Sequence, residues 1–326
     1  MRRHLIALAA LSAGTLALTA CGTTEPVASA KDKGTAAQAI TLTDDTGAKI
    51  KLDGPAKKVV GTEWNVVESL VTLGVDPVGV ADVKGYRTWD TAAPLRGTPK
   101  DIGTRGEPSM DTIASLSPDL IVATTDLPAA AVKQLRRIAP VLEVKSADAT
   151  DQIGRMKKNL DLIAQATGTT AQAAEANKTF DAKVAEAKKK LTDAGHAGDE
   201  IAFADGYVAA NQVSLRPYTD GSQIGSVNKA LGLKNAWKLK GDPAYGLAAT
   251  DVEGLSSLGG DTQFVYIGSD SEDDPFKKEL AKNAAWKALP FVKKGAVHRL
   301  PDGIWMFGGP KSMQAYIDAV TGVLTK

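Results

Sequence analysis

Residues 150–194 decide the fold, and they read TDQIGRMKKNLDLIAQATGTTAQAAEANKTFDAKVAEAKKKLTDA. The stretch contains no proline, and its one apparent break is Thr167-Gly168-Thr169-Thr170. On both sides of the break, apolar residues recur at spacings of three and four, which is typical of amphipathic helices. They are Ile153, Met156, Leu160 and Ile163 before it, and Ala173, Ala176, Phe180, Val184, Ala187 and Leu191 after it. The stretch predicts two consecutive helices, and about 20 residues of the first would span roughly 30 Å.

Short apolar segments alternate with helical segments on either side of this stretch. The expected strands are Lys58–Gly61, Pro77–Ala81, Asp119–Ala123 and Val141–Val144, then Ile201–Ala204, Gln212–Leu215, Phe264–Ile267 and Val297–Arg299. The expected helices are Val66–Leu73, Met110–Ser115 and Ala129–Ile138, then Ile224–Leu231, Val252–Leu258, Pro275–Lys282 and Pro310–Leu324. Fully apolar strands separated by helices form parallel sheets that helices cover on both faces.

The fold class that follows is α/β, with two parallel-sheet lobes bridged by a single long, rigid helix. One helix that crosses once resists bending, whereas lobes joined by two or three extended strands would close on a ligand like a trap. An ordinary surface helical hairpin remains the alternative for residues 150–194.

The first 38 residues indicate export and a lipid anchor. Arg2 and Arg3 precede an apolar run, Leu5–Leu18, that is too short to span a bilayer, and small residues lead to Cys21, the only cysteine. We expect residues 1–20 to be a lipoprotein signal peptide and Cys21 to carry lipid at the outer face of the cytoplasmic membrane. Stable anchoring needs more than one acyl chain. Residues 21–38 have almost no large apolar side chains and predict a flexible tether.

The folded body then divides into three parts. Residues 39–148 form an N-terminal α/β lobe, 149–195 the bridging helix and the helix that follows, and 196–326 a C-terminal α/β lobe. The N-terminal lobe opens with a hairpin of Ile40, Leu42, Ile50 and Leu52, which turns at Asp45-Thr46-Gly47.

Composition argues against several classes of function. The chain has 39 Lys and Arg residues against 38 Asp and Glu residues, so it lacks the basic field that nucleic acid would require. Three histidines and one cysteine cannot supply a typical zinc cluster. Nucleophile-elbow, dinucleotide-loop and P-loop motifs are all missing from the sequence. We therefore expect neither an enzyme, nor a cofactor, nor a metal held by protein ligands.

Aromatic residues and arginines instead gather in predicted loops. Three of the few arginines have aromatic or glycine neighbours there: Arg87, Arg105 and Arg216. Loops beyond the carboxyl ends of α/β strands converge on a crevice, where aromatic rings supply apolar area and guanidinium groups supply forked donors. The ligand-binding residues expected on this basis are Trp64, Tyr86, Arg87, Trp89, Arg105, Arg216, Tyr218, Tyr245, Trp305 and Phe307.

Several short motifs resemble those of iron–siderophore-binding lipoproteins, the substrate-binding proteins of ABC importers for ferric citrate and ferric hydroxamates. The likeness runs in order over nearly the whole mature chain. The motifs are Cys21, Trp64-Asn65-Val66-Val67-Glu68, Leu73–Val80, Gly103–Pro108, Ser117–Ile121, Leu231–Ala236, Tyr245-Gly246, Asp251-Val252-Glu253 and Trp305–Pro310.

The resemblance implies that a monomeric protein binds an Fe(III)–siderophore complex and delivers it unchanged to an ABC permease in the cytoplasmic membrane. Arg105 resembles the arginine that faces the chelate oxygens in hydroxamate binders, and Tyr245 the aromatic residue opposite it. Glu68 and Glu253 match acidic positions, one per lobe, that dock onto the permease. Cobalamin or haem as the cargo is the main alternative. An envelope hydrolase and a binder of free zinc or manganese are further ones.

Overall fold

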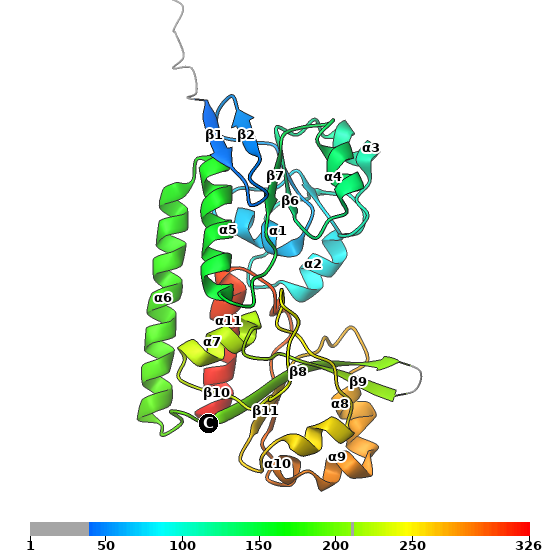
Figure 1. Ribbon diagram of the computed structural model, residues 1–326, viewed down its shortest axis with the longest axis vertical. Coiled ribbons are helices and arrows are strands. Elements are labelled where there is room, and N and C mark those ends of the chain that lie inside the picture. The colour runs from blue at the N-terminus through cyan, green and yellow to red at the C-terminus, as the bar shows by residue number, and fades with distance from the viewer. Residues whose placement is uncertain (1–38, 210–211) are drawn as a thin grey trace, which may run out of the picture. The chain divides into compact units, whose positions relative to one another are not determined.

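The computed structural model describes residues 39–209 and 212–326 (Figure 1). The predicted signal peptide, the lipid-bearing Cys21 and the tether lie outside the described residues, so they stay predictions. None of the helices that the structure describes combines the length and the apolar character needed to cross a bilayer.

The N-lobe, β1 to β7, is built around a five-stranded parallel sheet in the order β5-β4-β3-β6-β7. The expected hairpin precedes it: β1 (Ile40–Thr43) pairs antiparallel with β2 (Lys49–Leu52). The strands of the sheet are β3 (Val59–Gly61), β4 (Gly79–Val80), β5 (Lys100–Asp101), β6 (Leu120–Thr124) and β7 (Val141–Val144). The helices are α1 (Trp64–Thr72), α2 (Val83–Trp89), α3 (Met110–Ser115) and α4 (Ala129–Leu135). The predicted parallel sheet is confirmed in this lobe.

The C-lobe, β8 to α11, has a mixed sheet, which corrects the expectation of a purely parallel one. Four strands run parallel in the order β10-β8-β11-β12, and β9 pairs antiparallel with β8 because the two form a hairpin. The strands are β8 (Glu200–Ala209), β9 (Gln212–Pro217), β10 (Lys234–Asn235), β11 (Gln263–Tyr266) and β12 (Val297–Arg299). The helices are α7 (Gln223–Ala230), η1 (Glu253–Ser257), α8 (Pro275–Lys278), η2 (Leu280–Lys282), α9 (Ala284–Ala288), α10 (Pro290–Lys293) and α11 (Pro310–Leu324).

Two helices connect the lobes, α5 (Gln152–Thr167) and α6 (Thr170–Asp193), and the left-handed Gly168 separates them. The sequence assigned the crossing to the first helix, but the second makes it. α5 buries most of its length against α1, β1 and β7 of the N-lobe, whereas α6 runs beside α5 and then along α11 (Figure 1). At 1.5 Å per residue the 24 residues of α6 span about 36 Å.

The apolar core is continuous across the two lobes. One cluster joins Trp64 and Val67 of α1 with Phe180 of α6 and with Tyr316 and Ile317 of α11. Each large apolar side chain that is fully buried contributes about 1.5–3 kcal/mol relative to exposure. The lobes therefore share a packed seam as well as a connecting helix.

Candidate ligand-binding cleft

A cavity of about 330 Å³ lies between the two lobes. Its walls come from the segments that follow β3, β5, β10 and β12, and from the end of β9. Ligands of α/β folds bind beyond the carboxyl ends of parallel strands, and this volume is typical of small-molecule sites. The lining side chains are Glu63, Asn65 and Arg105 from the N-lobe, and Arg216, Tyr245, Leu247, Trp305 and Phe307 from the C-lobe.

Arg105 supplies the guanidinium group on the N-lobe side. Its Cζ lies 4.0 Å from the Trp64 ring centroid and 5.2 Å from that of Trp305, which allows cation–π contact with both rings. Its Nη1 donates a 2.9 Å hydrogen bond to Oε1 of Glu63. That same oxygen accepts from the backbone N–H of Trp64 at 2.8 Å and so caps α1. The N-terminus of α1 therefore holds Glu63 in place, and Glu63 in turn positions Arg105.

Arg216 supplies a second guanidinium group from the C-lobe, in a similar setting. Its Nε donates to Asp205 Oδ1 at 2.9 Å, and its Nη2 donates to the other carboxylate oxygen. Its Cζ lies 5.5 Å from the Phe307 ring centroid and 5.9 Å from that of Tyr218. Burial lowers the pKa of Arg216, but Tyr218 and Asp205 more than offset this and raise it. This side chain stays charged at any physiological pH.

Aromatic rings fill the space between the two arginines. Trp305 packs edge-on against Trp64 with centroids 4.7 Å apart, and Phe307 contacts both Trp305 and Tyr245. Within the described residues, Trp305 Nε1 has no hydrogen-bond partner. The Tyr245 hydroxyl donates across the lobes to Asp126. Burial and the nearby Asp126 raise the pKa of Tyr245, which keeps its phenol protonated.

No group of three or more His, Cys, Asp or Glu side chains in the described ranges could hold a metal ion. The cleft is lined by two guanidinium groups, one carboxylate, one amide, one phenol hydroxyl and apolar side chains, most of them aromatic. A family profile with the description "Periplasmic binding protein" matches residues 59–303. The chain belongs to this periplasmic binding protein family. The family is one of substrate-binding proteins without enzymatic activity.

Named relatives in this family cover most of the chain. The Fe(3+)-citrate-binding protein YfmC of Bacillus subtilis (strain 168) is 32% identical over 83% of this chain and 81% of its own length. The probable siderophore-binding lipoprotein YfiY of the same organism is 25% identical over 98% of both chains. The crystal structure of the siderophore-binding protein FhuD from Vibrio cholerae, with Fe3+–Desferal bound, matches with a TM-score of 0.73 at 26% identity. It covers 82% of this chain and 98% of that one. These matches confirm the two lobes joined by a long helix.

The structure brings together five of the predicted side chains in this periplasmic binding protein: Arg105, Arg216, Tyr245, Trp305 and Phe307. Trp64 and Tyr218 lie directly behind the arginines and support them without lining the cavity. The sequence analysis missed Glu63, Asn65, Asp126, Asp205 and Leu247. A hairpin assignment for β8 and β9 would have placed Asp205 directly opposite Arg216.

Three predicted residues of α2 lie outside the cavity. The segment was expected to be a loop, but Asp82 caps a helix there by accepting from the Gly85 N–H at 3.0 Å. Tyr86 is fully buried and donates to Ala93 O at 2.6 Å, and Arg87 Nη2 donates to Gly97 O. Trp89 packs against the shared core. The structure thus places these side chains in packing and in surface contacts.

The two glutamates expected to dock onto a permease differ in their exposure. Glu68 has no exposed surface, and its carboxylate accepts from the backbone N–H groups of Gly309 at 2.6 Å and Ser312 at 2.9 Å. A partner cannot reach this carboxylate here, so the expectation for Glu68 is wrong for this conformation. Its place inside the apolar run Val66–Val71 was the sequence signal for burial. Glu253 is exposed at the start of η1, and its docking role stays a prediction.

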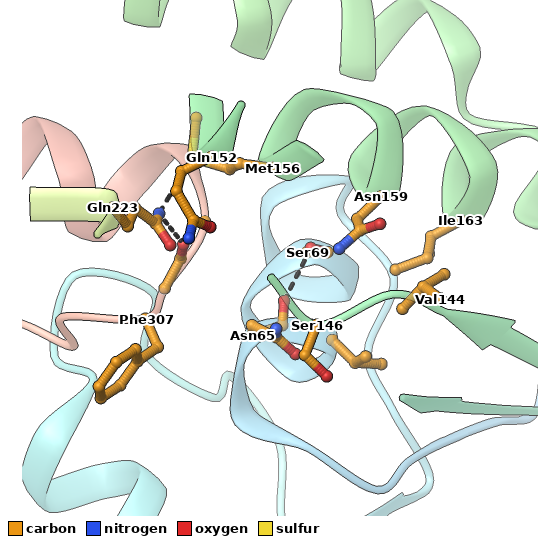
Figure 2. A pocket seen from close by; sticks show the side chains of 13 residues that line it. Asn65, Ser69, Val144, Ser146, Gln152, Met156, Asn159, Ile163, Gln223 and Phe307 are labelled. Carbon is orange, nitrogen blue, oxygen red and sulfur yellow. Dashed lines mark hydrogen bonds between the residues drawn. The ribbon is translucent and has the colours of Figure 1, made fainter. Parts of the chain in front are cut away.

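A second, small pocket of about 10 Å³ is lined by Phe307 together with polar and apolar side chains of both lobes, among them Gln152, Gln223 and Met156 (Figure 2). Gln223 Nε2 donates to Gly308 O at 2.6 Å, and Gln152 Nε2 donates to Ala244 O at 2.8 Å. These bonds hold the two loops that carry Phe307 and Tyr245. The helices α5 and α7 thereby fix the C-lobe wall of the cleft.

Proposed function

We propose that this protein binds a ferric siderophore in the cleft and delivers it to the permease of an ABC transporter for iron uptake. The observation that carries the proposal is the pair of guanidinium groups, Arg105 and Arg216, which face one cavity from opposite lobes, each over aromatic rings. N–H donors of this kind suit the oxygens of a chelate. Aromatic rings suit the apolar parts of its scaffold.

The donor set is consistent with iron that is already chelated. Fe(III) inside a siderophore has its coordination sphere filled by chelator oxygens, so the protein has to recognise the outside of the complex. The carboxylate and the phenol of the lining are already engaged, since Glu63 accepts from Arg105 and Tyr245 donates to Asp126, and the described residues contain no group of three or more His, Cys, Asp or Glu that could hold bare iron. The names of YfmC, YfiY and the Vibrio FhuD, which refer to ferric citrate and siderophores, support the same class of cargo.

The proposed location is the outer face of the cytoplasmic membrane, and it is supported by the sequence and by the relatives. Two relatives are named as lipoproteins, which supports lipid on Cys21 and an anchor at the outer face of the cytoplasmic membrane. Removal of residues 1–20 would leave 21–38 as the tether between the membrane and the lobes. A cleft held between two lobes and presented on a tether is suited to delivery at a permease.

Binding is tested by tryptophan fluorescence, since Trp305 lines the cleft and Trp64 lies behind it. Titration of the purified chain with ferric siderophores is expected to quench the emission with micromolar or lower affinity. Arg105→Ala should weaken binding at least about tenfold, because it removes charged donors worth about 1.5–3 kcal/mol. Arg87→Ala, on the exposed side of α2, is the matched control. Equal affinity in both variants would remove Arg105 from the site.

Delivery is tested separately, by uptake of radioactive ferric siderophore in cells. Glu253→Ala is expected to reduce uptake and to leave binding unchanged. Glu272→Ala, an equally exposed glutamate of the C-lobe, serves as the control. Normal uptake by the Glu253 variant would contradict the docking role.

A further inference from the structure

Each arginine of the cleft is already paired with a carboxylate. Glu63 accepts from Arg105, and its side chain is 23% exposed in the cavity wall. Asp205 binds Arg216 through two of the guanidinium nitrogens, and its side chain is 15% exposed. The lining includes no lysine or histidine. The two guanidinium charges are therefore balanced within the protein.

A third carboxylate makes the rim of the cleft negative. Asp126 of the N-lobe accepts from the Tyr245 hydroxyl, a neutral donor that brings no compensating charge. Among the described residues, the lining side chains and the side chains that hydrogen-bond to them include two guanidinium groups, of Arg105 and Arg216, and three carboxylates, of Glu63, Asp205 and Asp126. A ligand in this cleft therefore experiences an electrostatic potential that is neutral to slightly negative.

The charge of a ferric complex depends on the chemistry of its chelator. Three hydroxamates each contribute one negative charge and give a neutral ferric core, and an amine on the chelator then makes the complex cationic. Three catecholates each contribute two negative charges and leave a triply negative complex. Ferric citrate complexes also carry negative charge. Burying an anion without opposite charges is costly, and like charges at the rim add to that cost.

The pairing also limits the geometry that the arginines can offer. Asp205 takes the Nε–Nη2 edge of Arg216, which is one of the edges that bind a carboxylate with two parallel hydrogen bonds. Glu63 accepts a hydrogen bond from Nη1 of Arg105. The remaining N–H groups can donate single hydrogen bonds to the oxygens of a chelate, and the ring faces can pack against methylene linkers.

We infer that the cleft selects ferric tris-hydroxamates of neutral or positive net charge, and that Glu63 and Asp205 are the residues that set this preference. The inference rests on the proposed function and names the chemical class of its ligand. Loss of either carboxylate would release a positive charge into the cleft and shift the preference toward anionic complexes.

The test compares three ferric complexes on the purified full chain: the Desferal complex, which is a hydroxamate with a pendant amine, ferric citrate, and the tris-catecholate ferri-bacillibactin. We expect the Desferal complex to bind at least about tenfold more tightly than the other two. Glu63→Gln and Asp205→Asn should each raise the affinity for ferric citrate by about tenfold, the order of one unpaired charge near a ligand. The affinity for the Desferal complex should change less than about threefold.

The control is Asp76→Asn, which breaks an exposed ion pair with Arg96 elsewhere in the N-lobe. Glu63→Gln keeps a side-chain oxygen that can cap α1, so it decides the test if Asp205→Asn folds poorly. Binding of none of the three complexes would overturn the proposed function itself. Tighter binding of an anionic complex would overturn only the inferred charge preference. Unchanged affinity for ferric citrate in both carboxylate variants would overturn the role given to Glu63 and Asp205.

Discussion

The two lobes meet at a cleft and at a seam, and the two meeting places use carboxylates in different ways. In the cleft, Glu63 and Asp205 bind arginine side chains that remain partly exposed. In the seam, Glu68 is fully buried and binds the backbone at the start of α11. Glu63 is the N-cap residue of α1, and Glu68 lies in the second turn of the same helix. One tunes a site that a ligand enters, and the other fixes the lobes to each other.

The seam depends on Glu68 because α11 has no cap of its own. Its N-cap residue is Gly309, which has no side chain to accept the first backbone N–H groups, and Pro310 follows. A carboxylate at a helix N-terminus is also favoured by the helix dipole. A Cβ at Gly308 would lie 2.3 Å from Glu68 Oε2, so this close approach requires glycine.

A seam held by Glu68 predicts that Glu68→Ala is the most damaging single change. The variant leaves two buried N–H groups without an acceptor, and hydrogen bonds to a charged group contribute about 1.5–3 kcal/mol each. We expect the free energy of unfolding to fall by about 3–5 kcal/mol in urea denaturation. Glu253→Ala, at an exposed site, should change it by less than about 0.5 kcal/mol. A loss below about 1 kcal/mol for Glu68→Ala would show that the seam does not depend on this residue.

The cleft predicts a large loss of binding when its central aromatic side chain, Trp305, is removed. Trp305 is 8% exposed, lines the cavity and contacts Trp64 and Phe307. Removing a central aromatic side chain of a binding site costs about 2 kcal/mol or more, so Trp305→Ala should weaken binding of the Desferal complex at least about 30-fold. Isothermal titration calorimetry measures the affinity of each variant. Tyr207→Ala, at the most exposed aromatic position, is the control. Equal affinity in the two variants would place the ligand elsewhere.

The seam should also respond to pH through the buried Asp90, whose carboxyl group accepts from the Ser312 hydroxyl of α11 at 3.3 Å. Burial and the neighbouring Glu68 raise the pKa of Asp90 to about 10, against about 4 when unfolded. The folded protein holds this proton more tightly, so its stabilisation is fully present below about pH 4. The stabilisation then falls as pH rises toward the folded-state pKa.

Asp90→Asn keeps a neutral donor in the same place and should flatten this pH dependence. Between pH 5 and 9 we expect the free energy of unfolding of the native chain to fall relative to that of the variant by at least about 2 kcal/mol, since each pH unit between the two pKa values corresponds to 1.36 kcal/mol. Urea denaturation between pH 5 and 9 measures the difference. Parallel pH profiles for the two proteins would mean that Asp90 is ionised in the folded state.

The smallest expected effect concerns the Tyr245 hydroxyl, which joins the lobes beside the cleft. Tyr245→Phe removes the bond to Asp126 and keeps the ring, and a hydrogen bond contributes about 0.5–1.5 kcal/mol net. The affinity for the Desferal complex should change less than about tenfold. Tyr245→Ala, which also removes the ring, should lower the affinity further. The opposite order would assign the contribution of Tyr245 to its hydroxyl.

Local signals made part of the fold predictable. The start of α11 follows from Gly308-Gly309-Pro310. The start of α3 follows from Ser109, which accepts from the Thr112 N–H as an N-cap. β7 and β12 also lie at the expected residues. The identity of the crossing helix could not be predicted, because α5 and α6 share one apolar period and only tertiary packing distinguishes them.

The site was predictable in its residue types but not in its charges. Loop placement found both arginines and three of the rings. The partners of the arginines depend on strand register and on a helix cap, as for Asp205 opposite Arg216 and Glu63 at the start of α1. Glu68 resembled a surface docking residue by its motif, and only the position of α11 shows that it is buried.

A crystal structure of the purified chain with the ferric Desferal complex would decide whether the cleft binds chelated iron. We predict that the chelator supplies every iron ligand, and that N–H groups of Arg105 and Arg216 lie within hydrogen-bonding distance of its oxygens. Iron bonded directly to a protein atom, or a complex bound outside the space between Trp305 and the two arginines, would contradict the account.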